Sequence, residues 1–203
     1  MSSPEKRTFW YTMARGVTLL LTHTVFPTRW HIPSDLSIQG PAIIVSNHRH
    51  WLDPLLIGVK VKGYEIRFLG KKELVQTKVG KWLLTALHMI VVDRHNSDLK
   101  AMRACVQTIR EGHILSIFPE GTRCRGEAMA HLETGSSLIA LRCKVPVYPV
   151  LIDKPCKLFR RVNVYFGHAL SLDDLFEGPT DNQAAEEMTR RIREGVLSLG
   201  PKG

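Results

Sequence analysis

Long apolar runs are missing from this chain of 203 residues. No stretch reaches the roughly 18 continuous apolar residues that a membrane-spanning helix requires. A signal peptide is not evident either, because residues 1–8 are polar and no small-residue cleavage site follows a clean apolar segment. We therefore expect a chain that neither spans a membrane nor enters the secretory route.

Cysteines are few and scattered. The four of them, Cys105, Cys124, Cys143 and Cys156, form no C-x-x-C pair, and no histidine spacing completes a zinc site. This pattern is typical of reduced thiols in a protein of the cytosolic side.

Aromatic residues make up only 7% of the chain, and they are not interleaved with basic residues as in proteins that bind single strands. The formal net charge is nevertheless +9. Such an excess of positive charge indicates an anionic partner, namely a membrane surface, an acidic protein or a phosphorylated substrate. Since no zinc-finger or RNA-recognition signature appears, we expect no nucleic-acid partner.

Motifs for covalent or nucleotide chemistry are also missing. There is no G-x-S-x-G elbow, and the stretch from Gly58 to Gly63 lacks the Lys-Ser/Thr pair of a Walker loop. This favours direct transfer to a substrate hydroxyl over a covalent enzyme intermediate.

What the sequence does contain is an alternation of short apolar runs and amphipathic stretches. It predicts strands at 42–45, 64–69, 89–92, 114–118, 145–152 and 162–166, and helices at 54–61, 81–87, 98–111, 136–141 and 180–199. This order predicts an α/β fold with a largely parallel central sheet flanked by helices. Pro146 and Pro149 favour an edge position or a bulge for the fifth strand.

The N-terminal part has a different character. Residues 5–27 carry apolar side chains at helical spacing, beside basic residues: Phe9, Met13, Val17, Leu20 and Leu21. Such a helix packs on the core of its own domain or lies on anionic lipid, and the basic residues beside aromatic ones favour lipid. We divide the chain into 1–32, a membrane-associating amphipathic helical segment, and 33–203, the catalytic domain, with 28–41 as a linker.

The central stretch is the polar turn after the first strand of the catalytic domain. His48 lies in this turn, and Asp53 follows as a predicted N-cap, with Pro54 at the first position of the next helix. Each residue alone has a simpler explanation, as a solvated loop residue and a cap. Together, at the end of a buried strand, they predict that Asp53 bonds one ring nitrogen of His48 and leaves the other as a base.

Basic and polar side chains follow other predicted strands. Lys71 lies just past the second strand and Arg94 just past the third, while the fourth ends in Glu120-Gly121-Thr122-Arg123. The carboxyl ends of parallel strands share one edge of a sheet, so these residues should surround the histidine. Arginine is well suited to hold a phosphate through two parallel hydrogen bonds.

These residues carry a resemblance to the glycerolipid acyltransferases, the 1-acylglycerol-3-phosphate acyltransferase (PlsC-like) family. Residues 47–53 (N-H-R-H-W-L-D) resemble the family's N-H-x4-D block, and residues 118–123 match its F-P-E-G-T-R block without a change. The segments 71–74, 91–94 and 145–150 resemble three further blocks. Order and spacing agree over roughly residues 40–170.

The resemblance implies a peripheral enzyme of phospholipid biosynthesis at the cytoplasmic face of the membrane. His48, oriented by Asp53, would deprotonate the sn-2 hydroxyl of lysophosphatidate, which attacks the thioester of acyl-CoA or acyl-carrier protein. The acceptor phosphate would lie against Glu120, Gly121, Thr122, Arg123, Arg94 and Lys71. The family implies no metal and no tightly bound cofactor.

Departures from the family leave alternatives open. Glu133 stands two residues before Gly135, where the family usually has a lysine, so a lyso-lipid other than lysophosphatidate is the alternative acceptor. The pair His48 and His50, with Asp53 nearby, would also suit a metal-dependent hydrolase, although the remaining histidines are scattered. A third alternative is a lipid or nucleic-acid binder without activity, against which the intact His48 and Asp53 argue.

Overall fold

The computed structural model describes residues 9–61, 65–71, 81, 89–92, 99–124 and 126–201. Its strands are β1 (Thr28–His31), β2 (Ala42–Ser46), β3 (Ile66–Lys71), β4 (Ile90–Val92), β5 (Ile114–Ile117), β6 (Val147–Ile152) and β7 (Val162–Phe166). Its helices are α1 (Phe9–Thr24), α2 (Asp53–Gly58), α4 (Leu99–Arg110), α5 (Gly135–Cys143), α6 (Asp173–Glu177) and α7 (Asn182–Leu197). The predicted helix at 81–87 lies outside the described residues, apart from Lys81.

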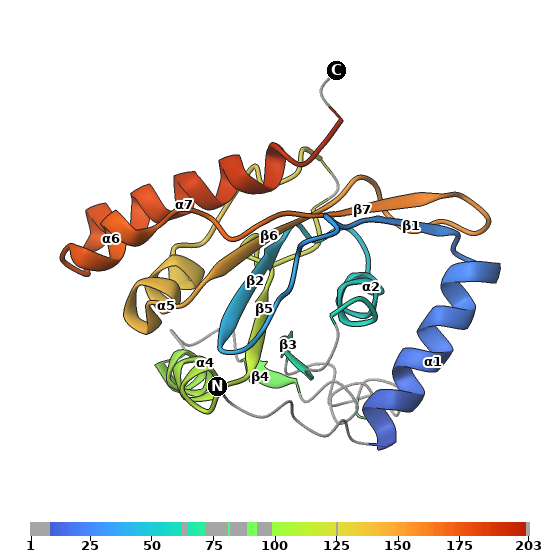
Figure 1. Cartoon of the computed structure of the whole chain (residues 1–203), viewed down its shortest axis with the longest axis horizontal. Coiled ribbons are helices and arrows are strands. Elements are labelled where there is room, and N and C mark those ends of the chain that lie inside the picture. Colours follow the sequence, from blue (N-terminus) through green and yellow to red (C-terminus); the bar gives the residue numbers. More distant parts are fainter. Residues whose placement is uncertain are drawn as a thin grey trace.

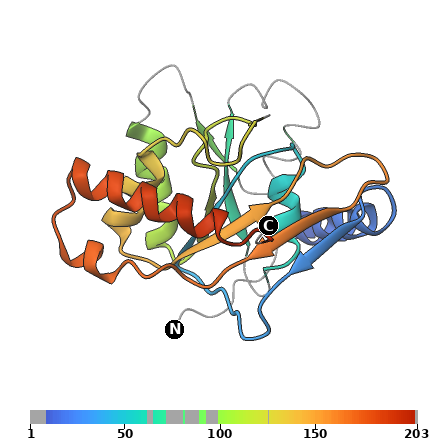
Figure 2. The same cartoon turned by 90° about the horizontal axis from the view of Figure 1, so that it is seen from above.

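The strands form one sheet in the order β1-β7-β6-β2-β5-β3-β4. Strands β6 and β7 pair antiparallel, and the other described pairings are parallel. Helices cover both faces of this sheet (Figures 1 and 2), as parallel strands require. The predicted α/β fold with a largely parallel sheet is thereby confirmed.

Strand β2 lies between two apolar cores, one on each face of the sheet. Ala42 and Ile44 pack into the core on the side of α1 and α2. Ile43 and Val45 pack into the core beneath α4, α5 and α7. All four side chains are fully buried, and burial of each large aliphatic side chain stabilises the fold by about 1.5–3 kcal/mol. The end of β2, from which the site loop leaves, is therefore held from both sides.

Of the two positions predicted for the strand with Pro146 and Pro149, an edge or a bulge, the edge is wrong, because β6 runs between β7 and β2. The carbonyl of Pro149 accepts the N–H of Gly167 at 2.9 Å. The nitrogen of Pro149 faces the same neighbour, just beyond the last paired residues, Val150 and Phe166. Because Pro149 has no N–H, a hydrogen-bond donor is missing just beyond the end of the β6–β7 ladder, and no bond within the ladder is lost.

The predicted linker at 28–41 is wrong in its first residues. Thr28 to His31 form β1, which pairs in parallel with β7 at the edge of the sheet. The strand is short and only partly buried, so its sequence carries little periodic signal. The chain therefore joins the sheet immediately after α1.

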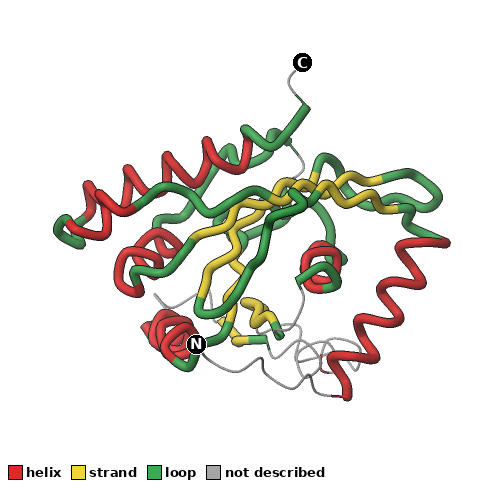
Figure 3. The backbone as a smooth tube through the Cα atoms, viewed as in Figure 1, coloured by secondary structure: helices red, strands yellow, loops and turns green. Residues whose placement is uncertain are grey.

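Helix α1 packs on the molecule through its polar side. Tyr11, Ala14, Thr18 and Thr22 are its buried residues. Both threonine hydroxyls bond carbonyls of their own helix, at 2.8 and 2.9 Å, so their burial leaves no unsatisfied donor. The guanidinium of Arg15 donates to the carbonyl of Val59 at 3.1 Å, at the end of α2. Helix α1 thus packs beside α2 (Figure 3), and it also reaches the sheet, because the hydroxyl of Tyr11 accepts the N–H of Ile66 in β3 at 3.5 Å.

The apolar side of α1 faces away from the protein. Phe9 is 73% exposed, Leu20 64%, Trp10 49% and Val17 47%, while Met13 and Leu21 are half-buried. The predicted apolar row therefore exists, and most of its members are largely exposed rather than buried in the domain's own core. None of the described helices is both long enough and apolar enough to cross a bilayer.

Candidate active site

The loop between β2 and α2 is organised by the carboxylate of Asp53, which is completely buried. Its Oδ2 lies 2.9 Å from Nδ1 of His48. The same oxygen accepts the backbone N–H groups of Arg49 and His50, both at 2.6 Å. The predicted contact between His48 and Asp53 is confirmed. The predicted N-cap is wrong, because the helix begins at Asp53 itself and the carboxylate turns back to the loop that precedes it.

This contact assigns the tautomer of His48. A carboxylate can only accept hydrogen bonds, so Nδ1 carries the proton and Nε2 has a free lone pair in the neutral ring. The ring of Phe118 stacks on the imidazole with centroids 4.4 Å apart and so fixes the plane of the ring. The side chain of His48 remains 19% exposed, which leaves it accessible as a base. Phe118 was not among the predicted site residues, although it opens the F-P-E-G-T-R block.

Glu120 connects this loop with the loop after β5. Its Oε2 accepts the backbone N–H of His48 at 2.7 Å, and its Oε1 accepts the N–H of Met129 at 2.6 Å. The N–H of Cys124 bonds the carbonyl of His48 at 2.9 Å and adds a second connection. Both carboxylate oxygens of Glu120 are thus occupied by the protein's own backbone. From the sequence, Glu120 was predicted among the residues around the substrate phosphate, with hydrogen bonds to backbone or arginine as the alternative; the contacts observed here are those of a positioning residue.

Asn47 fastens the other side of the loop. Its Nδ2 donates to the carbonyl of Ile152 at 2.9 Å, and its Oδ1 accepts the N–H of the same residue at 2.8 Å. Asn47 is completely buried, so it serves the end of β6 rather than a ligand. The loop of His48 is therefore connected to both strands that neighbour β2.

The turn from Gly121 to Arg123 borders the histidine loop. Gly121 has a φ of 63°, and its N–H closes the turn on the carbonyl of Phe118 at 3.0 Å. This φ lies in the left-handed region that favours glycine, and a Cβ built at this position would meet only the movable carboxylate end of Glu133. Thr122 and Arg123 are exposed.

The two remaining predicted residues are placed only in part. Lys71 is the last residue of β3, which lies beside β5 in the sheet, but its side chain is outside the described residues. Arg94 also lies outside them, two residues beyond β4. The parallel order β2-β5-β3-β4 confirms that the strands before these residues end at one edge.

The pKa of His50 reflects the charges around the histidine loop. Burial lowers its pKa below the usual 6.5, the charge of Asp53 opposes this effect, and the charges of Arg123 and His48 lower the pKa further. Arg123 therefore brings positive charge to the histidine loop. Within the described residues, no three His, Cys, Asp or Glu side chains are grouped as metal ligands.

Comparisons with known proteins match this arrangement. The Acyltransferase family model matches residues 27–153. The 1-acyl-sn-glycerol-3-phosphate acyltransferase of Bacillus subtilis (strain 168) is 30% identical over 168 residues, which cover 79% of this chain and 83% of that protein. The protein of the same name from Streptococcus pneumoniae (strain ATCC BAA-255 / R6) is 26% identical, covering 90% and 70%.

A solved structure has the same fold. The crystal structure of the 1-acyl-sn-glycerophosphate (LPA) acyltransferase PlsC from Thermotoga maritima superimposes with a TM-score of 0.64 and 20% identity. The match covers 96% of this chain and 79% of that one. The arrangement of strands and helices is therefore shared over nearly the whole chain.

The pKa of His50 gives the first test of the site. We expect Arg123→Gln to raise this pKa but to leave it below 6.5, because burial is the largest cause of the shift and remains. An NMR titration of the histidine rings measures both values, with Arg193→Gln on α7 as the charge-matched control. A pKa of His50 that does not respond to Arg123→Gln would show that Arg123 does not face the loop.

The same shift sets the sign of a pH dependence. Between the lowered folded pKa and 6.5, only the unfolded chain binds the proton at His50. His50 therefore reduces the free energy of unfolding as the pH falls through this window and leaves it unaffected above the window.

Proposed function

This chain belongs to the Acyltransferase family, and we propose that it transfers a fatty acyl group from a thioester to the free sn-2 hydroxyl of lysophosphatidate, giving phosphatidate. The observation that carries the proposal is the pair His48 and Asp53, in which Nδ1 is engaged and Nε2 is available. The donor is acyl-CoA or an acyl-carrier protein. No metal and no bound cofactor takes part in the proposed reaction.

The proposed reaction needs one base and no covalent enzyme intermediate. Nε2 of His48 takes the proton of the hydroxyl while its oxygen attacks the thioester carbonyl. The buried carboxylate of Asp53 stabilises the imidazolium that forms. As the tetrahedral intermediate collapses, the C–S bond breaks, and the imidazolium returns its proton to the departing thiolate. An ester and a free thiol result.

The acceptor phosphate is assigned to the turn after β5. Arg123 supplies a guanidinium there, and Gly121 and Thr122 add backbone and hydroxyl donors. Lys71 and Arg94 follow neighbouring strands of the same sheet edge and complete the basic rim in this proposal. Glu120 positions this turn against His48 and is not assigned to the substrate.

The outward face of α1 supports a peripheral location on the cytoplasmic face of an anionic membrane. Its exposed side chains Phe9, Trp10, Val17 and Leu20 are apolar, whereas its buried side is fully satisfied by hydrogen bonds. A net charge of +9 adds attraction to anionic headgroups. The lipid acceptor and product would then be reached without leaving the bilayer.

Glu133 favours a second acceptor class within the same reaction. Its side chain lies against Gly121, and its backbone N–H bonds the carbonyl of Pro119 at 2.9 Å. A carboxylate at this point disfavours the dianionic phosphate of lysophosphatidate. It is compatible with a phosphate that is esterified to an ammonium-bearing headgroup, as in lysophosphatidylethanolamine.

The catalytic pair is tested by replacing the base. We expect His48→Ala to lower kcat by about 10²–10⁴, the usual contribution of general base catalysis, in an assay of phosphatidate formed in lipid vesicles. Asp53→Asn should also lower kcat, because the amide no longer provides the carboxylate that Nδ1 bonds. Circular dichroism and vesicle binding of the variants provide the controls. Full activity of folded His48→Ala would refute the proposed role.

The role of Glu133 is tested by competing acceptors. We expect Glu133→Lys to raise the kcat/KM ratio of lysophosphatidate over lysophosphatidylethanolamine about five-fold, since an exposed charge contributes about 1 kcal/mol. Glu133→Gln, which only removes the negative charge, should give a smaller change in the same direction. An unchanged ratio in both variants would separate Glu133 from headgroup selection.

The membrane face is tested by placing a charge in it. We expect Leu20→Asp to weaken binding to phosphatidylglycerol vesicles at least about tenfold, because the burial of one leucine is lost. Leu197→Asp on α7 makes the same replacement at another exposed leucine and should leave vesicle binding unchanged. Equal binding of wild type and Leu20→Asp in a flotation assay would contradict this orientation.

A further inference from the structure

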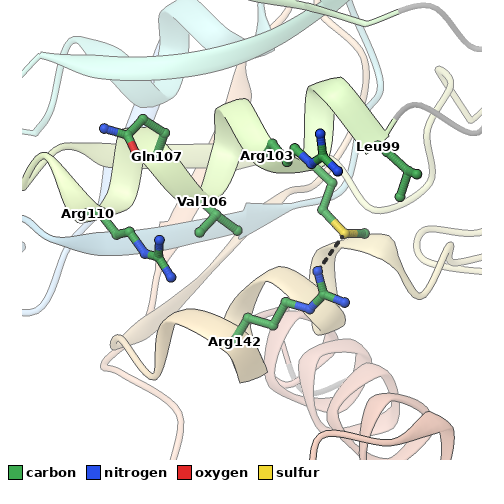
Figure 4. Close-up of a pocket in the computed structure, with 7 residues that line it drawn as sticks. Leu99, Arg103, Val106, Gln107, Arg110 and Arg142 are labelled. Atoms are coloured by element: carbon green, nitrogen blue, oxygen red, sulfur yellow. Dashed lines mark hydrogen bonds between the residues drawn. The ribbon is translucent and has the colours of Figure 1, made fainter.

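A groove of about 560 Å³ lies between α4 and α5, on the face of the sheet opposite to α1. Apolar side chains form part of its lining, and three arginines surround them: Leu99, Met102, Val106, Arg103, Arg110 and Arg142. Figure 4 shows the guanidinium groups of Arg110 and Arg142 in the space between the two helices. Leu99 is 64% exposed, so the groove combines accessible apolar surface with positive charge.

Among the described residues, the carboxylate nearest to this lining in sequence is that of Glu111, which accepts a hydrogen bond from Gln107 of the groove at 2.8 Å. Helices α4 and α5 carry Lys100, Arg103, Arg110 and Arg142 and contain no acidic residue. In the described part of the chain, no carboxylate forms an ion pair with the three arginines of the groove. One of them, Arg142, donates to the sulfur of Met102 at 3.5 Å.

Helix α7, on the same face, shows the opposite arrangement. Its Arg190 pairs with Glu187 and Glu194, and its Arg191 pairs with Glu187 and Asp174. These arginines are satisfied within the protein and are poorly suited to a partner. The groove arginines keep their donors for a partner, and that partner must be anionic.

The position of the groove selects a partner from the aqueous side. Since α1 and the groove lie on opposite faces of the sheet (Figure 1), a bilayer under α1 does not reach the groove. Helix α4 connects the carboxyl edge of β4 with the amino end of β5, and its 12 residues span about 18 Å. Its first residue, Leu99, therefore lies toward the sheet edge that carries His48.

We propose that this groove is the docking surface for the acidic carrier protein that delivers the acyl thioester. The proposal rests on the proposed function and narrows its donor to an acyl-carrier protein. Carboxylates along a helix of the carrier pair with Arg103, Arg110 and Arg142, and an apolar side chain packs between Leu99 and Val106. The prosthetic arm of the carrier then enters at the edge where α4 begins. Separated arginines along an open groove suit a protein surface, whose charges are also distributed.

The test compares two donors with the same acyl chain. Wild type, Arg103→Glu, Arg142→Glu and the control Arg193→Glu are assayed with palmitoyl-acyl-carrier protein and with palmitoyl-CoA, on vesicles containing lysophosphatidate. Arg193 is an exposed arginine of α7 outside the groove, and its replacement changes the net charge equally. We expect each groove variant to lower the ratio of kcat/KM for the carrier over that for CoA about tenfold, and Arg193→Glu to leave this ratio unchanged.

A direct binding measurement separates this proposal from the reaction itself. Fluorescence anisotropy of labelled palmitoyl-acyl-carrier protein should show binding to wild type that weakens with salt and weakens about tenfold in Arg103→Glu. If wild type binds the carrier but transfers no acyl group from either donor, the proposed function is contradicted while the docking surface is supported. An unchanged donor ratio, or a loss confined to palmitoyl-CoA, would overturn the docking surface and, in the second case, indicate a site for coenzyme A.

Discussion

The buried carboxylate of Asp53 is the constraint on which the site depends. One of its oxygens accepts the ring of His48 and two consecutive backbone N–H groups. A buried carboxylate that loses its donors costs about 3–5 kcal/mol, so the loop can adopt few other conformations while α2 stays packed. Glu120 repeats this solution at the neighbouring loop, with both oxygens on backbone N–H groups. Two buried carboxylates thus hold the base in place before any substrate arrives, which is the preorganisation that catalysis requires.

The apolar and charged surfaces are distributed on the two sides of this site. Helix α1 shows apolar side chains outward on one face of the sheet, and α4 and α5, which contain no acidic residue of their own, carry arginines on the other. In the proposed reaction the lipid acceptor comes from the first side and the donor from the second. They meet at the carboxyl edge of the strands, which is open to both. A parallel sheet offers this separation directly, because its helices cover the faces and leave the edge to the loops.

Much of this arrangement could be predicted from the sequence. Local signals predicted the parallel sheet, the helices between its strands and the contact of His48 with Asp53. These signals are short β-branched runs, helical periodicity and a polar turn at a strand end. The partner of Glu120 in the histidine loop did not follow, because the N–H of His48 lies 72 residues away in the sequence and the two loops meet only in the tertiary fold. The interior position of β6 was missed for a similar reason. Pro149 is acceptable there because the pairing of β6 with β7 ends beside it, and the sequence of β6 does not indicate where the neighbouring strand ends.

The same limit applies to charge. By composition alone, Arg110, Arg142 and Arg190 contribute alike to the net charge and predict only a basic surface. Their difference arises from spacing and packing: Glu187 and Glu194 lie three and four residues from Arg190 on one helix face, where side chains meet, whereas α4 and α5 supply no such acid. The arginines Arg190 and Arg191 of α7 bond carboxylates of the protein itself. Helices α4 and α5 contain no carboxylate for such pairs. The positive charges behind the net charge of +9 are therefore not equivalent. In the proposal, an acidic partner binds most favourably to the arginines of α4 and α5, which have no acid on their own helix.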